Sequence, residues 1–279
     1  MTLLFQLSLC VNSLTGTIPS SIGSLSSLTS ICLDDNNLHG TIPSSIGSLT
    51  LLRTLTLGYN SLSGTIPSSI GSLRSLQDLE ISGSSLNGTI PSGIWSLQSL
   101  FTLHLETNKL HGTIPSSISL LTSLYYLYLG SNSLSGTIPS GIGSLTNLRG
   151  LYLYSNSLAG TIPSSIGSLT QLTSLNLTSN QLVGTIPSTF SKLTSLSQLH
   201  LDTNYLTMGS ATTVPTSTFS SKTLSRYRSG YFTLSNNCLA FSFNSTSVSA
   251  THCAPTSGKL VIICEYAMSM NIYCLSVSK

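Results

Sequence analysis

One stretch of the chain decides the fold: Leu52-Arg-Thr-Leu55-Thr-Leu57-Gly-Tyr-Asn60-Ser-Leu62-Ser-Gly64-Thr-Ile66-Pro67-Ser-Ser-Ile70-Gly-Ser-Leu73. Its Gly-Thr-Ile-Pro step recurs every 24 residues, at Gly16, Gly40, Gly64, Gly88, Gly112, Gly136, Gly160 and Gly184. A fixed period of this size is typical of a solenoid, because one unit cannot bury its own apolar face and must stack against its neighbours. The spacing predicts nine stacked coils over residues 4–210.

Each coil contains a Leu-x-Leu alternation, such as Leu127-Tyr-Leu129, which predicts a short strand with one buried face. Stacking such strands gives a parallel sheet. The asparagine that follows each strand is expected to bond backbone groups of adjacent coils, because a buried turn must satisfy its amides. These asparagines are Asn12, Asn36, Asn60, Asn108, Asn132, Asn156, Asn180 and Asn204, and Ser84 interrupts the series.

The full pattern, Leu-x-x-Leu-x-Leu-x-x-Asn-x-Leu-x-Gly-Thr-Ile-Pro, resembles the plant-type leucine-rich repeat of receptor-like kinases, receptor-like proteins and polygalacturonase inhibitors. The resemblance covers about three-quarters of the chain. It implies an α/β-type solenoid, a right-handed superhelix with a concave parallel β-sheet and about nine to ten 24-residue coils. It also implies recognition rather than catalysis.

Composition excludes several classes of protein. The chain carries 10 Lys and Arg against 7 Asp and Glu, a net charge of +3 over 279 residues, so it offers no basic stripe for nucleic acid. With 40% apolar residues it lacks the signature of disorder, and it lacks the Ala, Glu and Lys excess of a coiled coil. Serine and threonine make up about a third of the chain and fall mainly in the repeated turns.

The ends of the chain depart from the repeat. Leu4 already stands in register, so the start is expected to lack the polar cap that closes a solenoid. Residues 1–210 are assigned to the solenoid, and residues 211–258 to a nine-residue insertion, a degenerate tenth coil and a cap closed by a Cys238–Cys253 disulfide. Residues 259–279 form a tail of uncertain order, too short and too polar for a clear membrane span.

The other cysteines are less well defined. Cys264 and Cys274 offer a second pair, whereas Cys10 and Cys32 lie two positions out of step on neighbouring strands. That offset predicts a separation of ~8 Å between Cα atoms, too far for a disulfide. No Cys-x-x-Cys spacing supports a zinc site, so neither a metal nor a cofactor is expected.

Function is expected at the positions where the coils differ, which lie on the concave face of the predicted sheet. Rare residues gather there in a chain dominated by serine, threonine and leucine. The predicted ligand-binding residues are Tyr126, Tyr128, Tyr152, Tyr154, Asp78, Glu80, His104 and Glu106, with Tyr125 at the edge. Tyrosine provides rigid contact area with a polar tip, as recognition surfaces often do, although aromatic residues are also ordinary strand formers.

Histidines on this face stand beside acids: His104 near Glu80 and Glu106, and His200 near Asp202. Such pairs could bind a metal or transfer protons. An open sheet offers neither a ligand cage nor a pocket that excludes water, so solvated surface groups are the favoured interpretation. No phosphate loop or metal spacing appears in the sequence, and no catalytic residue is assigned.

Two functions follow. The first is an extracellular or cell-surface module that binds a protein, peptide or glycan. The alternative is ice binding by a stack of threonines, and this ladder consists of Thr17, Thr41, Thr65, Thr89, Thr113, Thr137, Thr161 and Thr185. Three glycosylation sequons, at Asn87, Asn176 and Asn244, are compatible with secretion.

Overall fold

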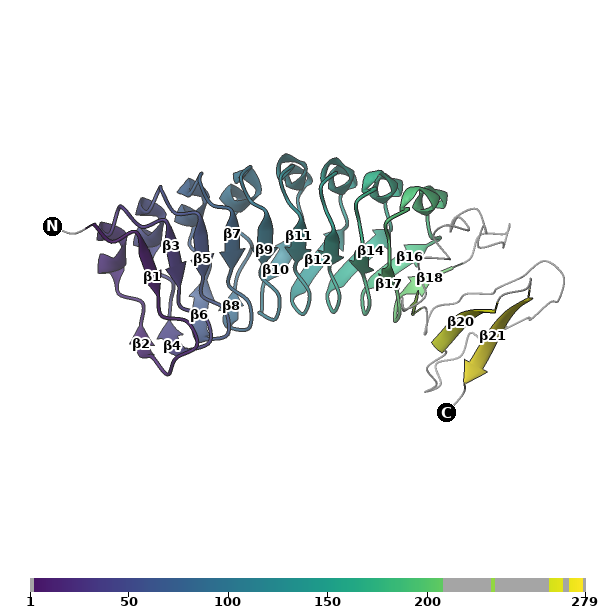
Figure 1. The fold of residues 1–279 in the computed structure, drawn as a ribbon, viewed down its shortest axis with the longest axis horizontal. Helices are drawn as coiled ribbons and strands as arrows, with labels where there is room; N and C mark the ends of the chain where they lie inside the picture. The colour runs from purple at the N-terminus through teal and green to yellow at the C-terminus, as the bar shows by residue number, and fades with distance from the viewer. Residues whose placement is uncertain (1–2, 208–231, 234–260, 268–270, 278–279) are drawn as a thin grey trace. The chain divides into compact units, whose positions relative to one another are not determined.

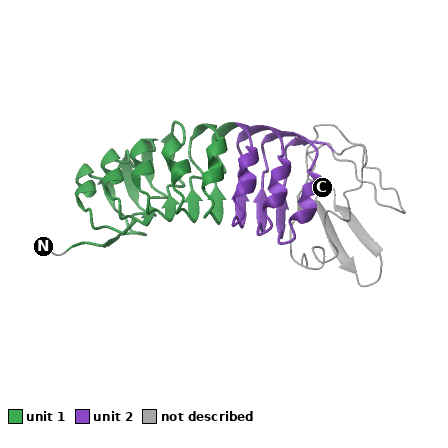
Figure 2. Ribbon diagram, turned by 90° about the horizontal axis from the view of Figure 1, so that it is seen from above, with its two compact units in different colours: residues 1–135 green, residues 136–279 purple. Residues whose placement is uncertain are grey.

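The computed structural model describes residues 3–207, 232–233, 261–267 and 271–277, and the chain divides into two compact units, residues 1–135 and 136–279 (Figure 2). Both units repeat one coil, in which a short strand, a second short strand and a 3₁₀ helix follow each other. The helical part of each coil is one 3₁₀ segment, because five residues between prolines and leucines leave no room for an α-helix.

The first strand of each coil is the predicted Leu-x-Leu step. In the first unit these strands are β1 (Gln6–Ser8), β3 (Ser30–Cys32), β5 (Thr54–Thr56), β7 (Asp78–Glu80), β9 (Thr102–His104) and β11 (Tyr126–Tyr128) (Figure 1). They pair in parallel in this order, each with the residue 24 positions along, as Leu55 with Leu79. The central residue of each strand from β3 onward, Ile31 in β3 and a leucine in the others, is buried in the core, and its neighbours are half-buried.

A second set of parallel strands follows the asparagine turns and was not predicted. These strands are β2 (Thr15–Thr17), β4 (Asn37–Gly40), β6 (Ser61–Thr65), β8 (Ser85–Asn87), β10 (His111–Thr113) and β12 (Ser133–Thr137). Here a residue pairs with the one 22 positions along, as Gly40 with Leu62. The glycine in this step adopts a left-handed backbone, for example φ +74° at Gly64, which lets the chain bend toward the helix.

A 3₁₀ helix closes each coil and starts after the proline of Gly-Thr-Ile-Pro. In the first unit the helices are η1 (Ser20–Ser24), η2 (Ser44–Ser48), η3 (Ser68–Ser72), η4 (Ser92–Ser96) and η5 (Ser116–Leu120). Proline presets an extended backbone here, and its carbonyl accepts the N–H three residues on, as Ile70 to Pro67 at 3.1 Å. The isoleucine of each helix is buried with the strand leucines, which builds one continuous apolar core within the unit.

The asparagine ladder is confirmed. The Asn60 amide donates to the carbonyls of Leu33, Leu57 and Gly58 at 3.0–3.1 Å, and its Oδ1 accepts the N–H of Leu38 at 2.9 Å. One side chain thus bonds two neighbouring coils. At the interruption, the side chain of Ser84 makes one hydrogen bond, from its hydroxyl to the carbonyl of Asn60 at 3.3 Å.

The second unit repeats the same architecture. Its elements are η6 (Ser140–Ser144), β13 (Gly150–Tyr152), β14 (Ser157–Thr161), η7 (Ser164–Ser168), β15 (Ser174–Asn176), β16 (Gln181–Gly184), η8 (Ser188–Lys192), β17 (Gln198–His200), β18 (Tyr205–Leu206), β19 (Phe232–Thr233), β20 (Val261–Ala267) and β21 (Asn271–Val277). Strand β19 pairs with β17 and places Phe232 opposite Leu199, 33 residues away. That register is one period plus the expected insertion of nine residues.

Toward the C-terminus, β20 and β21 form an antiparallel pair in which Cys264 stands opposite Cys274. The predicted Cys238–Cys253 disulfide and nearly all of residues 211–258 lie outside the described residues. In the described part of the chain, no helix has the length and apolar character needed to cross a membrane.

Candidate functional site

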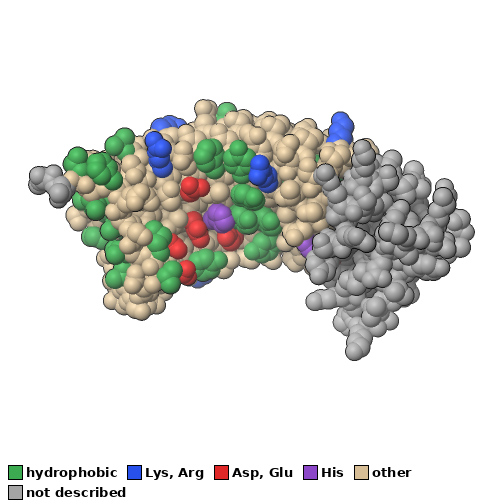
Figure 3. All heavy atoms as spheres, viewed as in Figure 1, with side chains coloured by type: hydrophobic (Ala, Val, Ile, Leu, Met, Phe, Trp, Pro, Cys, Tyr) green, Lys and Arg blue, Asp and Glu red, His purple; other side chains and the backbone are tan. Residues whose placement is uncertain are grey.

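The exposed side of strands β1, β3, β5, β7, β9 and β11, here called the strand face, carries the predicted ligand-binding residues of the first unit. Acidic side chains and a histidine gather on the side of the molecule that Figure 3 shows. Asp78 and Glu80 flank the buried leucine of β7, and His104 ends β9. In the sheet register Glu80 lies beside His104, which lies beside Tyr128, because each coil repeats the same strand position.

His104 is held from two sides. Its Nδ1 lies 3.2 Å from Oε1 of Glu106, and its ring stacks on Tyr128 with centroids 4.1 Å apart and planes 22° apart. The His104 side chain is 26% exposed and that of Glu106 is 14% exposed. Stacking on Tyr128 and the contact with Glu106 therefore hold the imidazole in one orientation while leaving part of the side chain exposed.

The carboxylates around His104 are in excess over nearby cations. Burial raises the pKa of Glu80, the charge of His104 opposes the rise, and the like charges of Asp34 and Glu106 add to it. The second oxygen of Glu106, Oε2, is buried and has no hydrogen-bond partner. Within residues 3–207, no lysine or arginine nitrogen lies within 4.0 Å of the Glu80 or Glu106 carboxylates. The site thus lacks a strong cationic group of its own.

Aromatic side chains border the carboxylates. Tyr126 and Tyr128 project from the same strand with ring centroids 6.2 Å apart. Phe101 and Tyr125 form a second pair at 5.8 Å, just before the strands begin. Phe101 was not predicted, because it precedes β9 and the prediction was confined to the strands and the residues that follow them. Asp78 also belongs to the strand face, where its Oδ1 accepts the hydroxyl of Thr102 at 2.8 Å.

The remaining predicted residues lie in the second unit. Tyr152 ends β13, where it pairs with Asn176 of β15, and Asn176 pairs in turn with His200 of β17. Tyr154 follows β13 by two residues and is half-buried, and Asp202 is buried.

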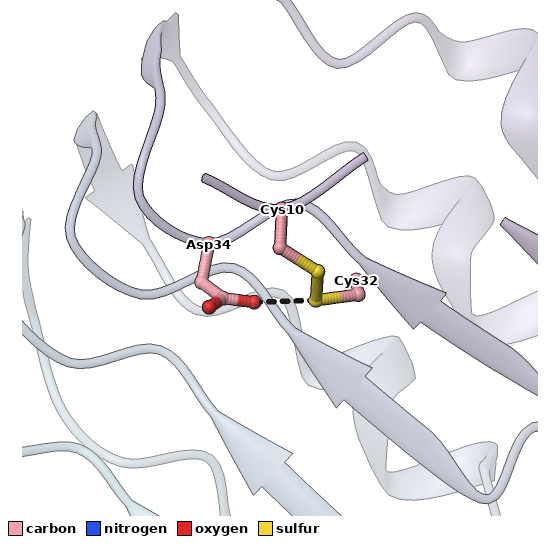
Figure 4. Close-up of side chains that lie close together, drawn as sticks. All are labelled: Cys10, Cys32 and Asp34. Atoms are coloured by element: carbon pink, nitrogen blue, oxygen red, sulfur yellow. Dashed lines mark hydrogen bonds between the residues drawn. A yellow bond between two sulfur atoms is a disulfide. The ribbon is translucent and has the colours of Figure 1, made fainter. Parts of the chain in front are cut away.

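Cys10 and Cys32 form a disulfide, so the prediction that they stand too far apart is wrong (Figure 4). That prediction extended β1 as a straight strand to Cys10. The strand instead ends at Ser8, and the N–H of Leu9 donates to the carbonyl of Cys32 at 2.9 Å. Beyond the strand end the offset of an extended chain no longer applies, and the two cysteine Cα atoms lie 5.4 Å apart.

Asp34 lies against this disulfide, with Oδ1 2.7 Å from Sγ of Cys32. A disulfide sulfur carries no proton to donate, so we assign the hydrogen bond of this oxygen to the hydroxyl of Thr56, at 2.6 Å. The two cysteine Sγ atoms and a carboxylate oxygen of Asp34, all of which could coordinate a metal ion, lie within 4.8 Å of one another. Zinc would require thiolates, and both sulfurs are committed to the disulfide.

The threonine ladder lies on the second set of strands and the residues that follow them. All eight threonines, Thr17, Thr41, Thr65, Thr89, Thr113, Thr137, Thr161 and Thr185, are exposed. Five belong to the first unit and three to the second. The methyl group of Thr41 covers Gly64 so closely that a Cβ there would meet it at 2.9 Å, and Thr65 covers Gly88 in the same way at 2.8 Å. Thr17, Thr89, Thr137 and Thr161 pack on the glycine of the next coil in the same way.

Comparison with known proteins places these observations in context. A family model described as Leucine rich repeat matches residues 50–110, 122–182 and 146–206, and a second model of the same description matches residues 27–49. No curated protein matches the chain.

Three solved structures are similar to the chain. The complex of PEPR1 with AtPEP1 shares 34% identity at a TM-score of 0.74, over 84% of this chain and 35% of that one. The plant peptide hormone receptor RGFR1 in complex with RGF2 shares 29% identity at 0.71, over 82% and 39%. A plant ice-binding protein shares 28% at 0.71, over 86% and 74%. The chain thus spans less than half the length of the two receptors.

Proposed function

This chain belongs to the leucine-rich repeat family, and on that premise we propose that its strand face binds a peptide or protein ligand without catalysing a reaction. We place this binding outside the cell or at its surface. The proposal concerns the first unit, where Glu80, His104, Glu106 and Tyr128 lie together.

The observation that carries the proposal is the grouping of carboxylates and stacked aromatic rings on a scaffold with few charges. Only 6% of residues in the chain are charged, yet Asp34, Asp78, Glu80 and Glu106 all lie on or beside this one face. Aromatic rings provide binding area at little entropic cost because they have few rotatable bonds. Oriented carboxylates add specificity through charge-assisted hydrogen bonds.

The chemistry of the site favours a ligand with a lysine or arginine side chain. A cation placed against Glu80 and Glu106 would offset two negative charges that, within residues 3–207, have no lysine or arginine nitrogen within 4.0 Å. It would also relieve the repulsion that helps to raise the pKa of Glu80. The faces of Tyr126 and Tyr128 are suited to a neighbouring cation through their π electrons. The similar structure of RGFR1, a plant peptide hormone receptor, holds RGF2 in complex, which supports a peptide as the ligand class.

Catalysis is not part of the proposal. His104 and Glu106 could exchange a proton, but the His104 side chain is partly exposed on an open sheet. General acid–base catalysis depends on a substrate held in a fixed pose, and metal catalysis on a ligand set. The strand face is instead suited to contact over an extended surface.

The test is capture of the full chain on an array of synthetic peptides of equal length that differ in lysine and arginine content. We expect basic peptides to be captured, and Tyr128→Ala to weaken capture roughly 30-fold, the change for a hot-spot residue of ~2 kcal/mol. Tyr205→Ala is the matched control, because Tyr205 is 66% exposed and lies on β18. Equal capture by both variants, with melting temperatures unchanged, would refute the assignment.

Ice binding is the second candidate, and one observation favours it. The eight exposed threonines repeat at one position per coil, and several are held by packing on a glycine of the next coil. An ordered array of hydroxyl and methyl groups without charge is what an ice lattice would require. The similar ice-binding protein is also covered over 74% of its length, more than either receptor.

A thermal-hysteresis and ice-recrystallisation assay on the full chain separates the two candidates. Ice binding predicts activity that Thr65→Lys removes and Tyr128→Ala leaves intact, since only the first substitution alters the ladder. An inactive wild-type chain would eliminate this candidate and leave peptide binding untouched.

A further inference from the structure

Two of the three sequons fall on described residues, and they lie on different surfaces. Asn87-Gly-Thr89 belongs to the threonine-ladder surface of the first unit, and Asn176-Leu-Thr178 belongs to the strand series β13, β15 and β17 of the second. The third, at Asn244, lies outside the described residues. A surface that carries a glycan cannot make flat contacts with a partner. Glycans at Asn87 and at Asn176 would therefore block different surfaces.

The Asn87 side chain is free to carry a bulky group. It ends β8 and is exposed, and the buried residue of that strand is its neighbour Leu86. Gly88 turns the backbone with φ +75°, which separates the side chain of Asn87 from that of Thr89. Thr89 is exposed as well. Both the acceptor asparagine, Asn87, and the hydroxyl residue, Thr89, are therefore accessible to solvent.

Asn176 is more confined. It is half-buried in β15 between Tyr152 and His200, its register partners on either side. Its Oδ1 accepts the N–H of Thr178 at 3.1 Å, which ties the side-chain amide to the backbone. The middle residue, Leu177, is fully buried and donates its N–H to the carbonyl of His200 at 2.8 Å. A glycan here would stand inside a row of larger side chains.

We propose that Asn87 is the site of an N-linked glycan and that Asn176 is left unmodified. The inference rests on the proposed location outside the cell, where such glycans occur. The reaction joins Nδ2 of Asn87 to C1 of an oligosaccharide carried on a polyisoprenyl pyrophosphate. The C1–O bond to the pyrophosphate breaks, the lipid pyrophosphate leaves, and Nδ2 loses one proton.

The glycan would close one surface and keep the other open. Asn87 pairs directly with Thr65 across the β6–β8 ladder, and Thr89 is two residues away. A sugar at this position covers the middle of the first unit's threonine ladder, an uncharged surface otherwise available to ice or to a second copy. The strand face lies on other strands and keeps its carboxylates and tyrosines accessible. Occupancy of Asn87 thus favours peptide binding over ice binding.

The test is glycopeptide mapping of the full chain secreted from a eukaryotic cell behind a cleavable leader. An amidase that releases N-linked glycans converts each occupied asparagine to aspartate, so every sequon is assigned separately by mass. We expect Asn87 to be occupied in most molecules and Asn176 to be unmodified. An unmodified Asn87 or an occupied Asn176 would overturn the proposal.

Variants sharpen the result. Asn87→Gln and Thr89→Ala each remove the same sequon by different residues, and both should lose one glycan mass that Asn176→Gln retains. If either variant fails to leave the cell, mapping of the wild-type chain decides by itself. Peptide capture is a separate readout: Asn87→Gln should leave it unchanged, so failure of the glycan proposal and failure of the binding proposal are distinguishable.

Discussion

His104 shows how a single residue organises the site. Its ring stacks on Tyr128 and its Nδ1 contacts Glu106, so three residues from neighbouring coils fix each other's orientation. Glu80 approaches the same ring from the opposite neighbouring strand. Preorganised side chains lose little freedom when a ligand binds, which favours affinity. The arrangement comes at the expense of stability, because Glu80 is partly desolvated.

Replacing Glu80 by glutamine tests that electrostatic account. Burial raises the pKa of Glu80 in the folded chain, so folding favours the protonated form. Its contribution to stability is complete below the ordinary glutamate pKa of about 4.3 and is lost as the pH rises through the higher folded value. Glu80→Gln should therefore raise the denaturation midpoint at pH 7 and leave it nearly unchanged at pH 3.5. A lower midpoint at pH 7 would contradict the assignment.

The same substitution should have the opposite effect on binding. Glutamine cannot offer a charge-assisted hydrogen bond to a lysine or arginine, so Glu80→Gln should weaken capture of a basic peptide while stabilising the chain. Affinity measured at low and high salt checks this, because the loss should shrink as salt screens the wild-type charge. Unchanged affinity at low salt would remove Glu80 from the site.

At the scale of elements, the asparagine turns join one coil to the next. Asn60 makes four hydrogen bonds, two within its own turn and two to the preceding coil, and Asn108 makes the corresponding set two coils later. The coil between them has Ser84, whose shorter side chain reaches only the carbonyl of Asn60. The ladder is therefore weakest at the coil that carries Glu80.

Ser84→Asn should restore the ladder and stabilise the chain. The backbone at this position already matches that of the asparagines in the ladder. The Ser84 N–H donates to the carbonyl of Thr107 at 3.2 Å, and the Asn108 N–H donates to the carbonyl of Ser131 at 3.1 Å in the same way. Each added net hydrogen bond contributes about 1 kcal/mol, and chemical denaturation measures the gain. Ser85→Asn, at an exposed position, is the control and should change nothing. Equal denaturation midpoints for the two variants would show that an asparagine at position 84 adds no stabilising hydrogen bonds.

The Cys10–Cys32 disulfide is expected to hold the first coil against the second. A bridge between residues 22 apart stabilises by ~3 kcal/mol in chain-entropy terms. Because solenoid coils contact mainly their neighbours, the effect should stay local. Reduction, or Cys10→Ser with Cys32→Ser, should speed hydrogen exchange at the Leu9 amide and leave the Leu57 amide unchanged. Unaltered exchange at Leu9 would mean that the disulfide contributes nothing to the first coil.

Periodicity explains how much of this fold was predictable. The strand leucines, the asparagine ladder and the threonine ladder all follow from the 24-residue register, because an identical residue in each coil occupies an identical environment. Residues that break the period were not predictable in this way. Whether Cys10 reaches Cys32 depends on where β1 ends, and the pairing of Phe101 with Tyr125 depends on side-chain direction just before a strand.

Over the whole molecule, the charged residues are unevenly distributed. Positive and negative residues nearly balance over the chain, with a net charge of +3, yet the acids gather on the strand face of the first unit. Both units share one scaffold, so the scaffold alone cannot localise function. Function is localised by the residues that differ between coils, and three of the seven acidic residues, Asp78, Glu80 and Glu106, lie on β7 or just beyond β9.

Side-chain footprinting of the full chain, with and without a basic peptide captured on the array, tests the central claim most directly. Hydroxyl radicals label exposed tyrosine and histidine side chains, so the labelled residues report which surface the peptide covers. Peptide binding on the strand face predicts protection of His104, Tyr126 and Tyr128, with Tyr59 and Tyr205 labelled equally in both samples. Protection confined to Tyr59 or Tyr205, with His104 and Tyr128 unchanged, would contradict it.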